Sequence, residues 1–148
     1  NDIVATGNKK CGGILIEVSG EANADISAVI GIGLNIRMPL HSAEKIDQPW
    51  TDLNQQAGGK TVSRNHVLIE LLNDLLTGLQ SFEEMGPADF LVHWPEYDML
   101  MNQEVKLIDG QQNQNGIVLG ISEHGALRLQ QGNVERHYHS GEISVRLL

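Results

Sequence analysis

The sequence is poor in cysteine, in aromatic residues and in positive charge. Its single cysteine excludes an internal disulfide and fits a reducing compartment, so we expect a cytoplasmic protein. Aromatic residues make up only 4% of the 148 residues, so leucine, isoleucine and valine must build the core. The formal net charge of -9 argues against binding of nucleic acid or anionic lipid by this segment, because phosphate contacts require a basic surface.

Long apolar runs are also missing. No run approaches the length of a membrane span, and no signal-like stretch opens the chain, so no membrane association is expected. Apolar residues nevertheless make up 41% of the sequence, which is enough for a core, and the length suits one domain plus a small second one. The chain begins at Asn1 without a methionine, and we interpret it as part of a longer protein.

Two apolar strands are predicted near the N-terminus. Residues 12–18 follow a polar turn and form the second strand of a hairpin, and residues 28–36 form the next strand. Their continuous apolar character predicts burial on both faces. Residues 37–50 contain two prolines and little periodicity, which predicts a mobile surface loop.

Helical periodicity begins after Ser63, a candidate N-cap. Leucines then recur at helical spacing as far as Phe82, and Gly86 ends the pattern. Pro87 suits the first turn of a second helix, which we expect to end by Trp94 because a proline follows.

The last fifty residues have a different character. Five short strand-like runs alternate with turns rich in glycine, asparagine and glutamine, which predicts a small barrel. The runs are residues 105–108, 116–121, 126–129, 134–139 and 143–147. Residues 111–115 are predicted to form a hairpin tip, and the domain boundary is expected near residues 98–102.

Lys10 is the first candidate for chemistry, together with Gly12 and Gly13 beside it at a strand start. A lysine there can neutralise a carboxylate or phosphate, although a solvated turn lysine is the alternative. The glycines allow a flat ligand ring to approach closely, or they form a bulge.

A second group of candidates is the motif Gly31-x-Gly33-x-Asn35 and, further on, Trp50. The motif lacks the third glycine and the helix of a dinucleotide fingerprint. It either leaves room for a ligand, with Asn35 offering an amide, or is an ordinary strand end. The indole of Trp50 can stack on an adenine or anchor the preceding loop on the core.

Charged and metal-ligating residues in the last third give weaker signals. His137 and His139 share a strand face, but a third ligand is not evident, so no metal site is predicted. Lys106, Glu142 and Arg146 lie on or beside the first and last predicted strands, where a solvated surface is the ordinary explanation.

In combination, these motifs resemble the bacterial biotin protein ligases that are also biotin operon repressors. The matching segments, in chain order, are Asn1-Asp2, Lys10 to Glu17, Gly31 to Asn35, Glu104 to Leu107, Gly125 to Leu127 and Gly141 to Arg146. They correspond to the family's Trp-Pro-Asn-Asp, Lys-x-x-Gly-Ile-Leu-x-Glu, Gly-x-Gly-x-Asn, Pro-Val-Lys-Leu, Gly-Ala-Leu and Gly-Glu-Ile-Ser-Leu-Arg motifs. The resemblance covers nearly the whole chain.

The resemblance implies an α+β fold. Residues 1–98 are expected to form the C-terminal half of a class II aminoacyl-tRNA-synthetase-like biotin ligase catalytic domain, and residues 99–148 a small SH3-like β-barrel. It also implies that biotin and ATP, with Mg²⁺, give biotinyl-5'-adenylate. Biotin then passes to a lysine of the biotin carboxyl carrier protein of acetyl-CoA carboxylase. A homodimer through strand 12–18 and its neighbours is expected, and DNA binding only through an N-terminal domain that this chain lacks.

Carried over to this sequence, the resemblance assigns roles to individual residues. Lys10 contacts the biotin carboxylate and the developing acyl phosphate. The biotin slot is lined by Gly12, Gly13, Gly31 and Gly33. The residues that contact the nucleotide or adenylate are Asn35, the loop residues His41, Ile46 and Trp50, and Lys106, Glu142 and Arg146. The last three are also candidates for contact with the carrier.

Two departures from the family pattern are visible. His41 stands where the family often has an apolar loop residue, and the family's Gly-Arg-Gly-Arg-Arg-Gly loop is not in this chain. We therefore expect this chain alone to have little ligase activity and no operator binding. The alternatives are a lipoate protein ligase-like enzyme and a non-catalytic dimerisation or carrier-binding module.

Overall fold

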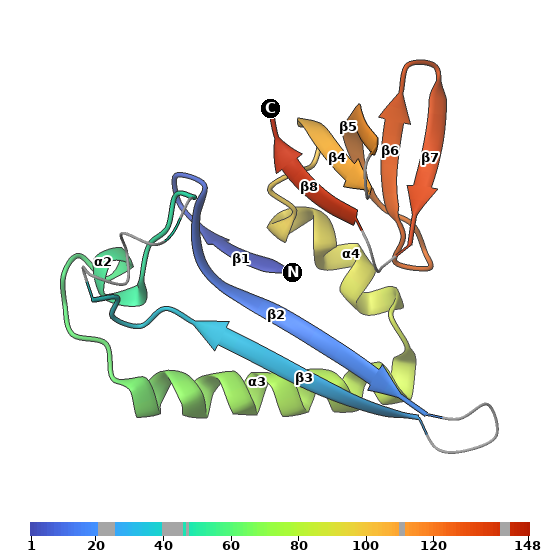
Figure 1. The fold of residues 1–148 in the computed structure, drawn as a ribbon. Helices are drawn as coiled ribbons and strands as arrows, with labels where there is room; N and C mark the ends of the chain where they lie inside the picture. The colour runs from blue at the N-terminus through green and yellow to red at the C-terminus, as the bar shows by residue number, and fades with distance from the viewer. Residues whose placement is uncertain (21–25, 40–45, 47, 110–111, 140–142) are drawn as a thin grey trace. The chain divides into compact units, whose positions relative to one another are not determined.

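The structure is a computed structural model that describes residues 1–20, 26–39, 46, 48–109, 112–139 and 143–148 (Figure 1). The chain divides into two compact units, Asn1–Asp74 and Leu75–Leu148, with the division inside the long helix α3. This division does not test the domain boundary predicted between residues 98 and 99, which stays a prediction.

The first unit contains a three-stranded antiparallel sheet in the order β1-β2-β3 (Figure 1). Its strands are β1 (Asp2–Ala5), β2 (Lys9–Ser19) and β3 (Ser27–Leu34). The hairpin and the two predicted apolar strands are confirmed, although β2 begins earlier and β3 ends earlier than expected. Gly7 and Asn8 turn the chain between β1 and β2 with φ angles of 81° and 55°, a conformation that glycine and asparagine tolerate.

Apolar side chains of this sheet remain exposed. Leu15, Val18 and Val29 keep 61%, 66% and 62% of their surface accessible. The predicted burial of both faces is therefore wrong for this chain, because no layer among the described residues covers these side chains. Apolar areas of this kind mark surfaces that another polypeptide or a ligand covers.

The predicted long helix is confirmed as α3 (Arg64–Met85). The Ser63 hydroxyl accepts a hydrogen bond from the His66 amide at 3.4 Å, as an N-cap does, and Gly86 ends the helix with a φ of 73°. A short helix that the sequence analysis did not predict, α2 (Leu53–Gln56), precedes it.

The second predicted helix, α4 (Ala88–Tyr97), begins directly after Pro87 but does not end by Trp94. It continues for another turn through Pro95, because a proline inside a helix forfeits one backbone hydrogen bond without cancelling those around it. Asp98 supports this last turn: its amide donates to the Trp94 carbonyl at 3.0 Å, and its carboxylate accepts from the Trp94 indole at 3.1 Å.

The second unit contains a five-stranded antiparallel sheet in the order β7-β6-β5-β4-β8 (Figure 1). The strands are β4 (Glu104–Asp109), β5 (Gln112–Ile121), β6 (Leu127–Gln131), β7 (Val134–Tyr138) and β8 (Ile143–Leu147). All five predicted strands are confirmed within a few residues of their predicted ends.

The hairpin tip predicted at residues 111–115 is wrong for residues 112–115, which belong to β5 and pair with β4, while residue 111 lies outside the described part. Polar side chains can extend a strand when they form hydrogen bonds with side chains of neighbouring strands. The side-chain oxygen of Gln114 accepts from Gln131 at 3.0 Å and from the hydroxyl of Tyr138 at 3.3 Å.

A small core lies on one face of the five-stranded sheet. Val105, Leu107, Val118 and Leu129 are fully buried, and they alternate with outward-facing residues along their strands as a period of two requires. Whether the sheet closes into the predicted SH3-like barrel stays a prediction. Within the described residues, no helix is long and apolar enough to cross a membrane.

Candidate functional site

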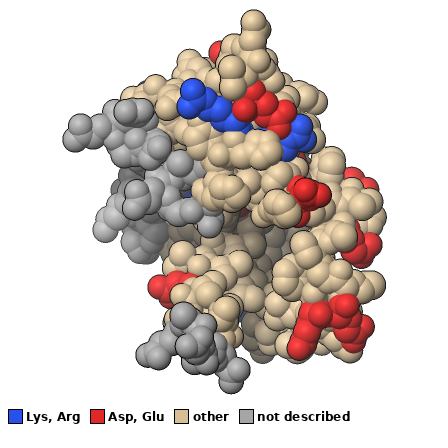
Figure 2. Space-filling model, turned by 90° about the vertical axis from the view of Figure 1, so that its right-hand side faces the viewer, with Lys and Arg blue, Asp and Glu red and all other residues tan. Residues whose placement is uncertain are grey.

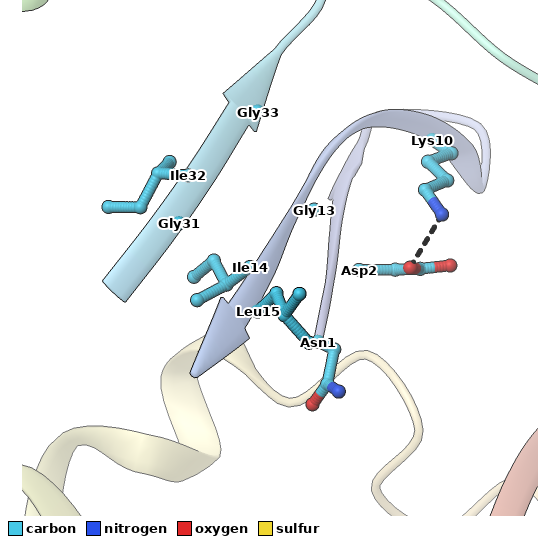
Figure 3. Close-up of a pocket in the computed structure, with 9 residues that line it drawn as sticks. All are labelled: Asn1, Asp2, Lys10, Gly13, Ile14, Leu15, Gly31, Ile32 and Gly33. Atoms are coloured by element: carbon cyan, nitrogen blue, oxygen red, sulfur yellow. Dashed lines mark ion pairs between the residues drawn. The ribbon is translucent and has the colours of Figure 1, made fainter. Parts of the chain in front are cut away.

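A pocket of about 490 Å³ opens on the first sheet, where β1, β2 and β3 lie side by side (Figure 3). This is within the size range of small-molecule sites. Its lining combines one charged pair with apolar side chains and bare backbone; the residues are Asn1, Asp2, Lys10, Gly13, Ile14, Leu15, Gly31, Ile32 and Gly33. Such a lining suits a small, largely apolar molecule that carries one acidic group.

Lys10 supplies the positive charge of the pocket. Its ammonium lies 2.7 Å from the carboxylate of Asp2, and both side chains are about one-third exposed (Figure 3). Because both side chains remain reachable by solvent, an incoming carboxylate or phosphate can replace Asp2 as the partner of this ammonium. The sequence motif contained Asp2, but sequence reasoning assigned it no role in the site.

Three of the four predicted slot glycines line the pocket, and the protein's own packing does not require them to be glycine. A Cβ added at Gly13, Gly31 or Gly33 would have its nearest neighbour at 3.6, 3.6 or 3.9 Å, which is ordinary van der Waals contact. The missing side chains therefore leave space that only a ligand would use.

Gly12 differs from these three. A Cβ there would lie 2.3 Å from the Gly33 carbonyl oxygen and 2.9 Å from Leu34 Cδ2, so the close approach of β2 and β3 excludes any side chain. Gly12 is buried and does not line the pocket. Its part in the biotin slot stays a prediction, and the structure gives it a packing role.

Asn35 and Trp50 are attached to the same end of β2 as Lys10. The Asn35 amide donates to the carbonyl of Cys11 at 2.8 Å, and Trp50 forms a parallel bridge with Lys10. The side-chain amide of Asn35 also donates to the Thr51 carbonyl at 3.1 Å. Residues that are far apart in sequence therefore meet beside the pocket lysine.

Asp52 follows Trp50 and Thr51 in the sequence and is buried. It is 4% exposed, and its carboxylate accepts hydrogen bonds from the amides of Met38 at 2.9 Å and of Gln55 at 2.8 Å. Burial raises the pKa of Asp52, but these hydrogen bonds outweigh that effect, so the pKa lies below its usual range. Burial, and secondarily the charge of Asp52, raises the pKa of the neighbouring Cys11 thiol, which therefore stays protonated and packs as a small apolar group.

Of the remaining predicted residues, the described ones are Ile46, Lys106 and Arg146. Lys106 and Arg146 face each other in register on β4 and β8, in the second unit. Ile46 is half-buried, and no contact of its side chain supports or opposes a role. His41 and Glu142 lie outside the described residues.

A charged cluster on β6 and β7 has its own electrostatics. Arg128 donates two hydrogen bonds to Glu135, at 2.7 and 3.2 Å, and His137 lies 2.8 Å from the same carboxylate. The hydrogen bond from Arg128, then that from His137, lowers the pKa of Glu135 to about 2. Figure 2 shows one face of the molecule, where acidic side chains are spread over the surface with few basic ones among them.

The C-terminal part of the chain matches a known family. Residues 100–146 match the family model described as "Biotin protein ligase C terminal domain". Two curated relatives match the chain over most of its length: "Bifunctional ligase/repressor BirA" of Escherichia coli is 35% identical over 94% of this chain, and the protein of the same name from Bacillus subtilis is 28% identical over 98%. The chain spans 43% and 44% of the length of these two relatives.

Solved structures agree with the sequence matches. The apo structure of the biotin protein ligase from Aquifex aeolicus has a TM-score of 0.82 at 28% identity, covering 100% of this chain and 63% of that one. The same enzyme in complex with biotin and ATP has a TM-score of 0.76 at 27% identity, over 95% of this chain and 57% of that one. The chain is therefore similar to the biotin protein ligases. More particularly, it matches the C-terminal part of the bacterial bifunctional ligase/repressor, as the sequence motifs predicted.

Proposed function

We propose that the chain is the C-terminal part of a biotin protein ligase. It takes part in forming biotinyl-5'-adenylate from biotin and ATP, and in transferring biotin to a lysine of a biotin carboxyl carrier protein. The observation that carries this proposal is the pocket on the first sheet, where one ammonium stands beside three glycines that packing does not require. An apolar acid of the size of biotin fits this combination of space and charge.

In the first step, a carboxylate oxygen of biotin attacks the α-phosphorus of ATP, and pyrophosphate leaves. Two anions must approach each other, and Lys10 screens their repulsion once its ammonium exchanges Asp2 for the substrate. In the second step, the amine of the carrier lysine attacks the acyl carbon, AMP leaves, and an amide bond forms. Asn35 and Trp50, held beside Lys10, contact the adenylate in this proposal.

We also propose that Mg²⁺ binds together with the nucleotide. Magnesium usually keeps several waters and binds through one or two carboxylates together with substrate phosphates. Asp2 is the carboxylate of the pocket and fits that requirement once Lys10 has turned to the substrate. Among the described residues, no group of three metal-ligating side chains forms a separate site.

The finer architecture follows the same proposal: a class II synthetase-like half domain that carries the pocket, and an SH3-like barrel that presents Lys106 and Arg146 to the nucleotide or the carrier. Two cations opposite each other in a sheet repel, which favours a role in binding an anion. Repression is part of the name of the curated relatives. For this protein it would require a DNA-binding region outside the present chain.

A homodimer through strand 12–18 and its neighbours is also proposed. Residues 15–19 of β2 pair with β3 on one side, whereas the pairing with β1 ends at Gly13. Among the described residues, no strand pairs with this edge of residues 15–19, which carries exposed Leu15, Ile16 and Val18; its backbone groups are free to pair with a second copy. Sedimentation of the chain, compared with Ile16→Lys, tests this: a dimer that persists in the variant would contradict the proposal.

The experiment that tests the ligase proposal is a transfer assay with a carrier protein, biotin, ATP and Mg²⁺. The assay compares the chain alone with the chain joined to its natural N-terminal region. We expect activity in the joined protein, little in the chain alone, and loss of activity in Lys10→Gln of the joined protein. Transfer of lipoate but not of biotin would replace this proposal with a lipoate ligase. Binding of the carrier without transfer of either acid would favour a non-catalytic module.

A further inference from the structure

Asp52 is a buried carboxylate that the pocket does not contain. It keeps 4% of its surface accessible, and no ion pair neutralises it within the described residues. Burial of an unpaired carboxylate is unfavourable unless hydrogen bonds compensate for the lost water. A buried, unpaired carboxylate therefore indicates a specific structural or functional role.

Capping of α2 does not account for the charge. One carboxylate oxygen, Oδ1, accepts from the Gln55 amide at 2.8 Å and caps the helix. Serine or asparagine caps a helix about as well as aspartate, without a buried charge. Moreover, α2 has only four residues, and a helix this short does not need a charged cap.

The second oxygen acts across the chain. Oδ2 of Asp52 accepts from the backbone amide of Met38 at 2.9 Å, and from the side chain of Gln55 at 3.2 Å. Met38 lies fourteen positions earlier in the sequence, beyond the end of β3. The carboxylate therefore joins the segment that leaves β3 to the segment that enters α2.

The same two segments carry the adenylate candidates. Two backbone hydrogen bonds join the same segments as the bond from Met38 to Asp52. The Leu53 amide donates to the Asn35 carbonyl at 2.8 Å, and the Asn54 amide donates to the Ile36 carbonyl at 3.1 Å. Thr51 donates to the carbonyl of Lys10 at 2.9 Å, which ties the segment to β2. Among the described residues of these segments, Asp52 provides the side-chain acceptor of this set, and a charged acceptor makes the strongest hydrogen bond.

We propose that Asp52 is a positioning residue of the ligand site, which acts through its bond to Met38 and not through the helix cap. The bond keeps the chain after β3 against the chain before α2. In this way it holds Asn35 and Trp50 in place beside Lys10. The inference rests on the proposed function insofar as the ligand is an adenylate; the tether itself does not depend on it.

Asp52→Asn separates the tether from the cap in the 148-residue chain. Its remaining oxygen still caps Gln55, but an amide nitrogen then faces the donor of Met38. We expect the Met38 amide to exchange with solvent about tenfold faster or more, while the Gln55 amide keeps its protection. The side-chain resonances of Asn35 and Trp50 should shift. Gln55→Ala, which removes only one side-chain donor, is the matched control and should leave these signals in place.

Asp52→Ser provides a second test if the asparagine variant does not fold, since serine retains a cap oxygen and cannot reach Met38. Unchanged Met38 exchange, or unmoved Asn35 and Trp50 signals, in the folded variant would overturn the proposal and leave Asp52 as a cap. Titration of the joined protein with biotin, ATP and Mg²⁺ then tests the link to the site. Asp52→Asn should weaken binding about tenfold, and equal affinities would overturn that link. If the unmutated protein binds neither ligand, the ligase proposal fails, whereas the exchange result still decides the tether.

Discussion

The same substitution at two neighbouring glycines should have opposite consequences. At Gly12, an alanine Cβ would lie 2.3 Å from the Gly33 carbonyl oxygen, a backbone atom that cannot move without displacing β3. Overpacking of this kind lowers the free energy of unfolding by about 1–3 kcal/mol. At Gly31 the nearest atom would be 3.6 Å away, and its backbone does not require glycine, so Gly31→Ala should keep or raise this free energy, by about 0.4–1 kcal/mol.

Binding should show the reverse order. Gly31 lines the pocket and Gly12 does not, so the methyl group of Gly31→Ala takes space that we assign to biotin. One misplaced methyl group in an apolar site changes binding about 10- to 200-fold. Urea unfolding of the chain measures stability, and calorimetric titration of the joined protein with biotin measures affinity.

Two outcomes would contradict these expectations. If Gly31→Ala binds biotin as tightly as the unmodified protein, the pocket is not the biotin slot. If Gly12→Ala unfolds at the same urea concentration as the unmodified chain, β2 and β3 do not pack as closely at this position as the structure has them.

Four further predictions concern charge and core packing. Lys10→Gln should abolish biotin binding in a titration and cost at most about 1 kcal/mol of stability, since its ion pair is partly exposed. Because the pKa of Asp52 is lowered in the folded state, its charge stabilises the fold fully above the ordinary pKa of about 3.9. This stabilisation is lost as the pH falls through the lower pKa of the folded state, and acid unfolding of Asp52→Asn should lack this pH-dependent loss. An NMR titration should find Glu135 half-protonated near pH 2, and Arg128→Ala should raise that midpoint; an unmoved midpoint would contradict the assigned cause. Leu129→Ala should lower the free energy of unfolding by about 2–5 kcal/mol in urea, and a loss below 1 kcal/mol would contradict its place in the core.

Local pattern was sufficient for most elements of the fold. Apolar runs, the leucine spacing of α3 and the turn residues between short strands each report on a neighbourhood of a few residues, so strands and helices could be predicted. The end of α4 could not, because Pro95 is tolerated there through contacts of Asp98 with the turn before it. The strand residues 112–115 were missed for a similar reason: Gln114 finds its partners on β6 and β7.

The candidate site divides in the same way. Lys10, Gly13, Gly31 and Gly33 come from two strands, and family motifs were needed to select them because their local sequence is also that of ordinary strand ends. Gly12 carries the same motif, but only the register of β2 with β3 reveals its packing role.

Asp52 gave a weak local signal, as an acidic residue before a short helical stretch. Its bond to Met38 depends on a chain path that no pattern encodes. Side-chain contacts across such a distance follow from the folded structure and not from spacing.

Thermal melting with ligands measures whether this chain contributes to a biotin-binding site. The chain alone and the chain joined to its natural N-terminal region are heated with and without biotin, ATP and Mg²⁺, and with lipoate in place of biotin. A ligand at a hundred times its dissociation constant stabilises the folded state by about 2.7 kcal/mol, so specific binding raises the melting temperature. We expect biotin to raise the melting temperature of the joined protein, and to raise that of the chain alone little or not at all. A rise with lipoate and none with biotin would contradict this expectation.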